Sequence, residues 1–327
     1  MPLAIALGDP AGVGPEVVAK SWERRDVQAV PTFFAIGDGE AIASVWRGPT
    51  EMIGAPAEAA DCFRHALPVL QVGGGNSIDP GKPSLDGARN SLDALEMAVG
   101  LTRSGAAAAL VTGPVSKSQL YAIGFSHPGQ TEFVAERCGV SCDMVAMMLV
   151  GPTLRTVPVT THIPLRDVPQ ALTIERIVLK TRTTIKGLQR QFGIAEPRIA
   201  VAGLNPHAGE GGALGLEETE IVVPAIARLR EEGYDVSGPH PPDAMFHERA
   251  RAQYDAAICL YHDQALIPLK TLHFDGGVNM TLGLPIVRTS PDHGTAFGIA
   301  GRNSADPGAM IAALKTAAAA AERIAST

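Results

Sequence analysis

The stretch RIAVAGLNPHAG, residues 198–209, is a short apolar run closed by glycine, asparagine and proline. It predicts a buried β-strand, with His207 in the turn that follows. The same pattern recurs before His162, in VTTH (residues 159–162), and before His262, in LYHDQ (residues 260–264). Each histidine is therefore expected where a parallel strand ends, which is where α/β proteins build ligand sites.

Strand-like and helix-like segments alternate along the chain, a pattern typical of parallel sheets covered by helices on both faces. The expected strands are Leu3–Leu7, Thr32–Ile36, Ala107–Thr112, Met144–Val150, Arg155–Thr160, Arg198–Gly203 and Ala256–Tyr261. The expected helices are Ser91–Arg103, Thr131–Cys138, Ile174–Phe192, Glu217–Glu232 and Pro307–Arg323. The 327 residues exceed the usual size of one hydrophobic core, which predicts two domains.

The composition excludes several classes of partner. A formal charge of -7 provides no basic stripe for a nucleic-acid backbone. No apolar run has the length of a membrane span, and the N-terminus lacks the basic region of a signal peptide, so a cytoplasmic protein with no membrane partner is expected. The four cysteines lack the paired spacing of a zinc cluster and are interpreted as reduced, mostly buried thiols.

The three histidines are candidate ligands of one divalent metal ion. Neutral imidazole is the commonest metal-binding side chain, and three such ligands leave coordination positions open for a substrate. His162, His207 and His262 are too far apart in sequence to share one helix, so tertiary or quaternary structure must assemble the site. The alternative for each histidine is a structural role.

The glycine-rich segment Gly8–Glu16 follows the first expected strand and fits the pattern GxxxGxG. It is neither a Walker loop nor the GxGxxG dinucleotide fingerprint. Short-chain dehydrogenases are excluded because no tyrosine is followed by lysine four residues later. A Gly/Pro turn that opens a helix is the alternative interpretation.

Groups suited to an anionic ligand gather late in the sequence, at Lys270, Asn279, Arg288, Thr289 and Ser290. Lysine, arginine and an amide are what a phosphorylated or carboxylated substrate needs, and arginine adds a planar two-point grip. Exposed, solvated charges are the alternative.

Six motifs carry a resemblance to a known family. They are GDPAGVGPE (8–16), TGPVSK (112–117), PGQTEF (128–133), GLNPHAGEGG (203–212), YHDQ (261–264) and NMTLGLP (279–285). From Leu3 to about Asp306 the chain resembles the 4-hydroxythreonine-4-phosphate dehydrogenase family of pyridoxal phosphate biosynthesis. The resemblance implies a two-domain, three-layer α/β/α fold akin to isocitrate and isopropylmalate dehydrogenases, with the active site in a cleft. It also implies a homodimer whose active site draws residues from both subunits.

Residues 1–125 with 300–327 are expected to form the first α/β domain. Residues 126–299 are expected to form the second, which would carry most of the metal-binding and substrate-binding residues.

Carried over position by position, the family's functional residues fall largely on the groups already selected. The metal ligands fall on His162, His207 and His262, and the substrate contacts on Gln130, Thr131, Lys270, Asn279 and Arg288. The family frequently has histidine where this chain has Gln130, which cannot titrate near neutral pH. His293, Gly294, Thr295 and Ala296 are the expected contacts to the nicotinamide cofactor, by analogy with related decarboxylating dehydrogenases. Lys270 and Asp243 are the candidate catalytic residues, although Asp243 is equally interpretable as a turn cap.

The implied reaction oxidises 4-(phosphooxy)-L-threonine at C3, with hydride transfer to NAD or NADP and one divalent ion, zinc, magnesium or cobalt, at each site. The product, 2-amino-3-oxo-4-(phosphooxy)butanoate, would lose carbon dioxide to give 3-amino-2-oxopropyl phosphate, a step towards pyridoxine 5'-phosphate. Three alternatives stay open. They are a dehydrogenase of 4-phosphothreonate, phosphoerythronate or a cyclic dihydrodiol, a phosphoacyl transferase, and a binding module without catalysis.

Overall fold

The computed structural model describes residues 1–74 and 78–326. These residues form two compact units, residues 1–139 with 284–326 and residues 140–283. Residues 75–77 and 327, which belong to the expected first domain, lie outside the described part. The division differs from the expected one at both boundaries, because Gln130, Thr131 and Arg288 fall in the first unit.

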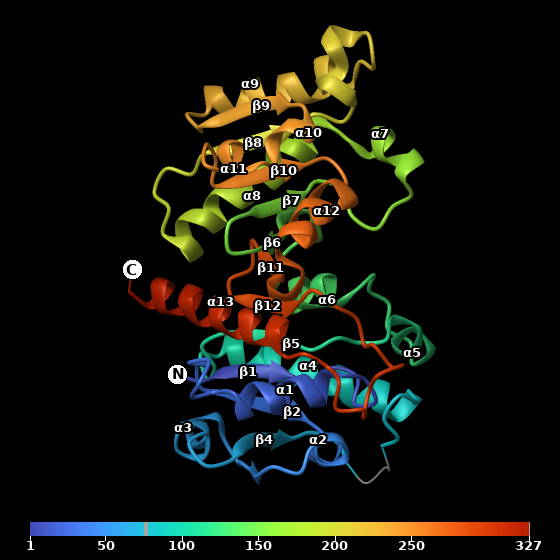
Figure 1. The fold of residues 1–327 in the computed structure, drawn as a ribbon, viewed down its shortest axis with the longest axis vertical. Helices are drawn as coiled ribbons and strands as arrows, with labels where there is room; N and C mark the ends of the chain where they lie inside the picture. The colour runs from blue at the N-terminus through green and yellow to red at the C-terminus, as the bar shows by residue number, and fades with distance from the viewer. Residues whose placement is uncertain (75–77, 327) are drawn as a thin grey trace. The chain divides into compact units, whose positions relative to one another are not determined.

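The first unit contains a parallel sheet (Figure 1). Its strands are β1 (Leu3–Ala6), β2 (Phe33–Gly37), β3 (Thr50–Met52), β4 (Leu67–Gln71), β5 (Leu110–Thr112) and β12 (Arg288–Pro291), in the order β3-β4-β2-β1-β5-β12. Every pair in this series is parallel. All residues of β1 and β2 are buried, so helices must cover both faces of the sheet.

The helices of the first unit follow its strands in alternation. They are α1 (Gly14–Glu23), α2 (Gly39–Val45), η1 (Pro56–Glu58), α3 (Ala59–Cys62), α4 (Leu85–Arg103), α5 (Lys117–Ala122), α6 (Gln130–Arg137) and α13 (Gly308–Ala325). The start of α1 packs tightly on the end of β1: a Cβ atom at Gly14, the first residue of the helix, would lie 2.1 Å from the carbonyl oxygen of Leu7. Only glycine fits at that position.

The second unit contains a mixed sheet. Its strands are β6 (Ala146–Val150), β7 (Arg155–Pro158), β8 (Ile199–Ala202), β9 (Val236–His240), β10 (Ala256–Cys259) and β11 (Val278–Leu282), in the order β11-β6-β7-β10-β8-β9. Strands β7, β10 and β8 are parallel, as expected, and β9, which was not among the expected strands, extends the parallel series. The expectation of a purely parallel sheet is wrong for β6, which pairs antiparallel with both β7 and β11. The reason is the short turn between β6 and β7, which is too short for a crossover helix.

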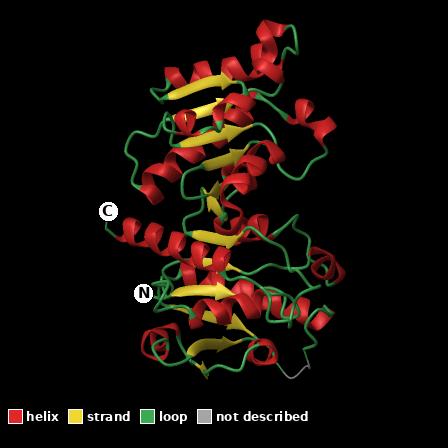
Figure 2. Cartoon of the chain, viewed as in Figure 1, coloured by secondary structure: helices red, strands yellow, loops and turns green. Residues whose placement is uncertain are grey.

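Helices also flank the strands of the second unit (Figure 2). They are η2 (Cys142–Met144), η3 (Leu165–Asp167), α7 (Val168–Ala171), α8 (Ile174–Phe192), η4 (Pro206–Gly212), η5 (Glu218–Val222), α9 (Val223–Glu231), α10 (Pro242–Met245), α11 (Glu248–Arg251), α12 (His262–His273) and η6 (Phe274–Gly276). Helix α8 has clear end signals: the Thr173 hydroxyl accepts from the Arg176 N–H at 3.1 Å, and Gly193 ends the helix with φ 68°. No helix in the described residues is both long and apolar enough to cross a membrane.

Candidate metal and substrate sites

Three histidines follow three neighbouring strands of the second unit. Strands β7, β10 and β8 lie side by side in that order and run parallel. His162, His262 and His207 follow their respective carboxyl ends. Because parallel strands end at the same edge of a sheet, the fold brings three sequence-distant imidazoles to one edge.

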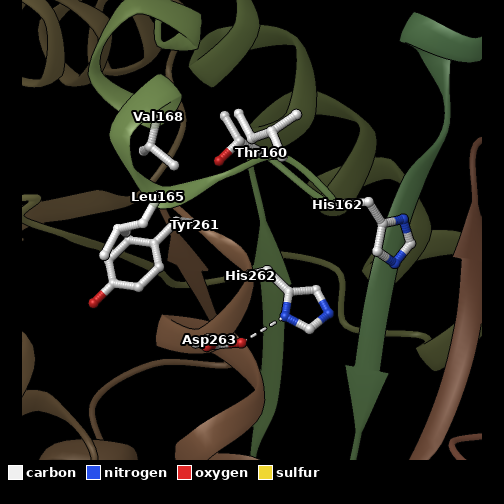
Figure 3. Close-up of a pocket in the computed structure, with 8 residues that line it drawn as sticks. Thr160, His162, Leu165, Val168, Tyr261, His262 and Asp263 are labelled. Carbon is white, nitrogen blue, oxygen red and sulfur yellow. Dashed lines mark hydrogen bonds and ion pairs between the residues drawn. The ribbon is translucent and has the colours of Figure 1, made fainter.

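His162 and His262 lie next to each other. Their ring centroids are 5.5 Å apart, with a 45° angle between the ring planes. Both line a cavity of about 280 Å³, and Figure 3 shows the two rings on neighbouring segments at its border. The cavity is lined by Thr160, His162, Ile163, Leu165, Val168, Tyr261, His262 and Asp263.

The imidazole of His262 is oriented by the next residue. Its Nδ1 lies 2.7 Å from Oδ1 of Asp263, drawn as a dashed line in Figure 3. A carboxylate on one ring nitrogen fixes the tautomer and presents the other nitrogen, Nε2, to a ligand. This is the usual arrangement around a histidine that binds a metal ion.

His207 lies on an unusual turn. Residues 207–211 all have positive φ, between 44° and 81°, and form a left-handed turn within η4. The Nδ1 of His207 lies 3.0 Å from Oε2 of Glu210, and its side chain is 68% exposed. As at His262, a carboxylate on Nδ1 leaves Nε2 as the ring nitrogen that is available to a ligand.

A buried carboxylate holds the strand end that leads to this turn. Glu218, 3% exposed, accepts hydrogen bonds at Oε1 from the backbone N–H groups of Leu204 and Asn205, both at 2.7 Å. Its Oε2 accepts from the side-chain amide of Asn205 at 2.9 Å. Burial opposes ionisation, but the hydrogen bonds from Asn205 and Leu204 outweigh it and hold the pKa of Glu218 below its ordinary value.

Gln264 connects two of the histidine-bearing strand ends. Its buried side chain donates to the Gly203 carbonyl at 2.8 Å and accepts from the Leu260 N–H at 2.6 Å. It thereby joins the ends of β8 and β10. The sequence did not predict a role for Gln264 or Glu218. A glutamine or glutamate near a turn is ordinarily interpreted as a solvated side chain, and only the tertiary structure shows that these two are buried.

The three histidines are not fully gathered within one chain. Among the described residues, their ligand atoms do not all lie within 4.8 Å of one another. The fold therefore brings His162 and His262 together and places His207 along the same edge.

Arg288 is the centre of a polar group in the first unit. It begins β12, is 3% exposed, and donates from Nη1 to the Thr131 hydroxyl at 3.2 Å and from Nη2 to the Thr112 hydroxyl at 2.8 Å. Burial lowers the pKa of Arg288 to about 10, although the charge of Glu132 favours the ionised form. A buried guanidinium with hydroxyl partners is well suited to an anionic ligand.

Gln130 lies in the same unit, at the start of α6. Its amide nitrogen donates to the Gly113 carbonyl at 3.2 Å. This contact orients the side chain against the segment that follows β5.

The other expected substrate and catalytic residues belong to the second unit. Lys270 lies on α12, the helix that begins with His262, about 12 Å further along the helix axis at 1.5 Å per residue. Asn279 lies on β11, and its Oδ1 is buried with no hydrogen-bond partner in the described part of the chain. Asp243 is exposed on the short helix α10, which packs against the turn of His207.

The loop of the expected cofactor residues follows β12 and packs on the glycine-rich turn. The Val13 N–H donates to the Thr295 carbonyl at 3.0 Å. His293 contacts the Gly294 carbonyl through Nδ1 at 3.0 Å, while its Nε2 is buried and has no partner among the described residues. Gly294 and Ala296 complete the loop, and both are exposed.

Comparison with known proteins gives concordant results. The model of the PdxA family, described as pyridoxal phosphate biosynthetic protein PdxA, matches residues 29–317. A 4-hydroxythreonine-4-phosphate dehydrogenase of Zymomonas mobilis is 55% identical over 317 residues, covering 97% of this chain and 95% of the relative. The crystal structure of 4-hydroxythreonine-4-phosphate dehydrogenase from Klebsiella pneumoniae superposes with a TM-score of 0.88 at 36% identity and covers 98% of both chains. A terephthalate 1,2-cis-dihydrodiol dehydrogenase from Burkholderia xenovorans superposes with a TM-score of 0.65 at 28% identity, covering 96% of both chains.

Proposed function

The chain belongs to the PdxA family of pyridoxal phosphate biosynthetic proteins, and from this premise we propose that it oxidises 4-(phosphooxy)-L-threonine at C3 with NAD or NADP as hydride acceptor. It is an oxidoreductase, as its close relatives are. Within the structure, the observation that carries the proposal is the placement of His162, His262 and His207 after three adjacent parallel strands.

The chemistry proceeds in two parts. Removal of the C3 hydride and the hydroxyl proton gives 2-amino-3-oxo-4-(phosphooxy)butanoate and the reduced cofactor. That product is a β-keto acid, and cleavage of its C1–C2 bond releases carbon dioxide and leaves 3-amino-2-oxopropyl phosphate. Aqueous protons complete the balance.

The donor set fits a divalent ion. His262 and His207 each have a carboxylate on Nδ1, which presents Nε2 as the ligand atom, and His162 lies beside His262. When bound, zinc, magnesium or cobalt would lower the pKa of a nearby hydroxyl and stabilise negative charge on its oxygen. Three imidazoles favour zinc or cobalt over magnesium, which prefers oxygen ligands.

The residues of the chain supply binding and orientation. Arg288, held by Thr112 and Thr131, would form charge-assisted hydrogen bonds with the phosphate or carboxylate of the substrate. The Oδ1 of Asn279, which has no hydrogen-bond partner among the described residues, would accept from an N–H or O–H group of a ligand. Lys270 would add a second cationic contact to the substrate. Holding the substrate in the reactive orientation can lower the activation barrier by several kcal/mol, on the order of what is seen for oriented reactants.

The loop His293–Ala296 is the proposed contact to the cofactor. Its hydrogen bond to the glycine-rich turn fixes its position, and the buried Nε2 of His293 would bond a polar group of the cofactor. Asp243 is proposed as an acid or base close to the turn of His207. Gln130 is proposed to contact the substrate and so to influence which substrate the protein accepts.

We propose further that a homodimer completes the site, since one chain does not bring all three imidazoles within 4.8 Å. Mixing two inactive variants with lesions in different units, His207→Ala and Arg288→Ala, tests this. Recovery of activity in verified mixed dimers supports a shared site, and its absence would show that His207 and Arg288 of one site come from the same chain.

One assay tests the reaction and the substrate together. NADH formation is measured with 4-phosphohydroxythreonine, phosphothreonate, phosphoerythronate and a cis-dihydrodiol, each with EDTA and with added zinc or cobalt. We expect turnover of the first substrate, loss with EDTA and recovery with metal. Faster turnover of another substrate would assign the chain to that substrate, in line with Gln130 and the dihydrodiol dehydrogenase similarity. Metal-independent turnover would contradict the proposed metal site.

A further inference from the structure

A second cluster of metal-binding side chains lies in the first unit, within a part of the fold that the proposed reaction does not use. The ligand atoms of Glu51, Cys62 and His65 all lie within 4.8 Å of one another. Among the described residues, this is the one group of three or more histidine, cysteine, aspartate or glutamate side chains that gathers so closely.

Local structure explains the gathering. Glu51 is the middle residue of β3, and Cys62 ends α3. The chain then turns tightly, with the N–H groups of His65 and Ala66 both donating to the Cys62 carbonyl, before it enters β4 beside β3. The turn places Cys62 and His65, three residues apart, on the side that faces Glu51.

We propose that Glu51, Cys62 and His65 form a separate site for a zinc-like divalent cation. A thiolate, an imidazole and a carboxylate are all common zinc ligands, and two of them come from a short Cys-x-x-His segment. Sulfur and nitrogen ligands disfavour magnesium and calcium. A water molecule would fill the fourth tetrahedral position.

The existing contacts among the three side chains fit this role. Nε2 of His65 lies 2.9 Å from Oε2 of Glu51, with side chains 64% and 51% exposed. A contact between two side chains that are so exposed to solvent contributes little to stability by itself. The Cys62 thiol, 3% exposed, contacts the Ala66 carbonyl at 3.7 Å and also interacts with the Glu51 carboxylate.

A reactive or redox-sensing cysteine is the competing explanation for this cluster. Such cysteines are exposed and have lowered pKa values. Burial, together with the charge and hydrogen bond of Glu51 and the charge of Glu58, raises the pKa of the Cys62 thiol to about 11. The same negative charges that suppress the free thiolate attract a divalent cation, which would replace the thiol proton on binding.

Cobalt(II) spectroscopy distinguishes this site from the histidine site. Cobalt bound to a thiolate has an intense charge-transfer band in the near ultraviolet, whereas cobalt bound only to imidazoles does not. We expect the band when cobalt is titrated into the full-length protein. We expect it to be lost in Cys62→Ser and to require at least tenfold more cobalt in His65→Ala. Cys142→Ser, which removes an exposed cysteine elsewhere, is the matched control and should keep the band.

A thermal measurement keeps the test independent of the buried Cys62 substitution. His65 is exposed, so His65→Ala should fold normally. Zinc should raise the melting temperature of the wild-type protein more than that of His65→Ala, because the histidine site contributes equally to both. No charge-transfer band in the wild type, a band unchanged in His65→Ala, or a band lost only in Cys142→Ser would overturn the proposal. None of these results bears on the NADH assay, which tests the other site.

Discussion

Glu218 supports His207 without belonging to the proposed ligand set, and its removal should separate positioning from binding. It accepts three hydrogen bonds from Leu204 and Asn205, at the strand end that leads to the histidine turn. Glu218→Ala leaves these buried donors without an acceptor. At about 1–3 kcal/mol for each unsatisfied donor, partly offset by water entry, the expected loss is about 2–4 kcal/mol of unfolding free energy.

Glu218→Gln should cost less. One amide oxygen can still accept from both backbone N–H groups, while the new NH₂ group faces the Asn205 amide, so a loss of about 1–2 kcal/mol is expected. Glu220→Gln is the matched control, because Glu220 is an exposed carboxylate on the same element. Urea denaturation of the full chain measures all three variants.

The functional readout is metal affinity. A looser His207 turn should weaken cobalt binding to the histidine site by roughly 10–100-fold in Glu218→Ala, the usual range for residues that support a ligand. The stability gap between wild type and Glu218→Gln should also depend on pH. Because the folded-state pKa of Glu218 lies below its ordinary value of 4.5, its stabilising effect is complete above that value and is lost as pH falls through the folded-state pKa. If Glu218→Ala keeps the stability and the cobalt affinity of the wild-type protein, Glu218 does not position His207.

Other substitutions probe separate parts of the molecule. His207→Ala should abolish NADH formation while the urea midpoint stays unchanged, because the side chain is exposed; near-normal turnover would remove His207 from the site. Arg288→Lys should raise the KM for the phosphorylated substrate by about 10–100-fold, the loss of one charge-assisted hydrogen bond, with the KM for NAD unchanged; equal changes in both would argue against an anion contact. Asp255→Asn should destabilise the protein at neutral pH, and urea denaturation should show this destabilisation shrinking as the pH falls below the ordinary aspartate pKa of 3.8. Although burial raises the pKa of Asp255, hydrogen bonds from Arg198 lower it further, so the stabilisation is present above the ordinary pKa and lost in acid. A gap that does not shrink in acid would contradict this.

The sequence was sufficient to predict the strands that carry the histidines. The apolar runs before His162, His207 and His262 are short, uninterrupted and closed by turn residues, and they became β7, β8 and β10. Their adjacency could not be predicted, because strand order depends on how the helices pack between them. It is this order that places the three imidazoles along one edge.

Other elements lacked a local signal. β11 contains the polar residues Asn279 and Thr281, and β12 begins with a charged arginine, so neither resembles a buried strand in sequence. Arg288 lies in the first unit because β12 pairs with β5, a contact distant in sequence. The expected end of the second domain at residue 299 was placed without knowledge of this pairing, so it put Arg288 in the wrong unit.

The cysteines show the same limit. Cys62 and Cys259 are buried, as expected, but Cys142 is exposed and Cys138 is partly exposed. Spacing between cysteines alone gave no zinc motif. The cluster with Glu51 and His65 combines three residue types from β3 and the turn after α3, which only the folded chain brings together.

The left-handed turn at residues 207–211 also restricts which sequences the protein can accept. Four consecutive residues after His207 hold φ values that side chains branched at Cβ strongly avoid. A randomised library covering these codons, selected for growth without added vitamin B6, should return mostly glycine, asparagine and aspartate, with valine, isoleucine and threonine depleted. Substrate range would therefore be easier to alter at Gln130 than beside His207.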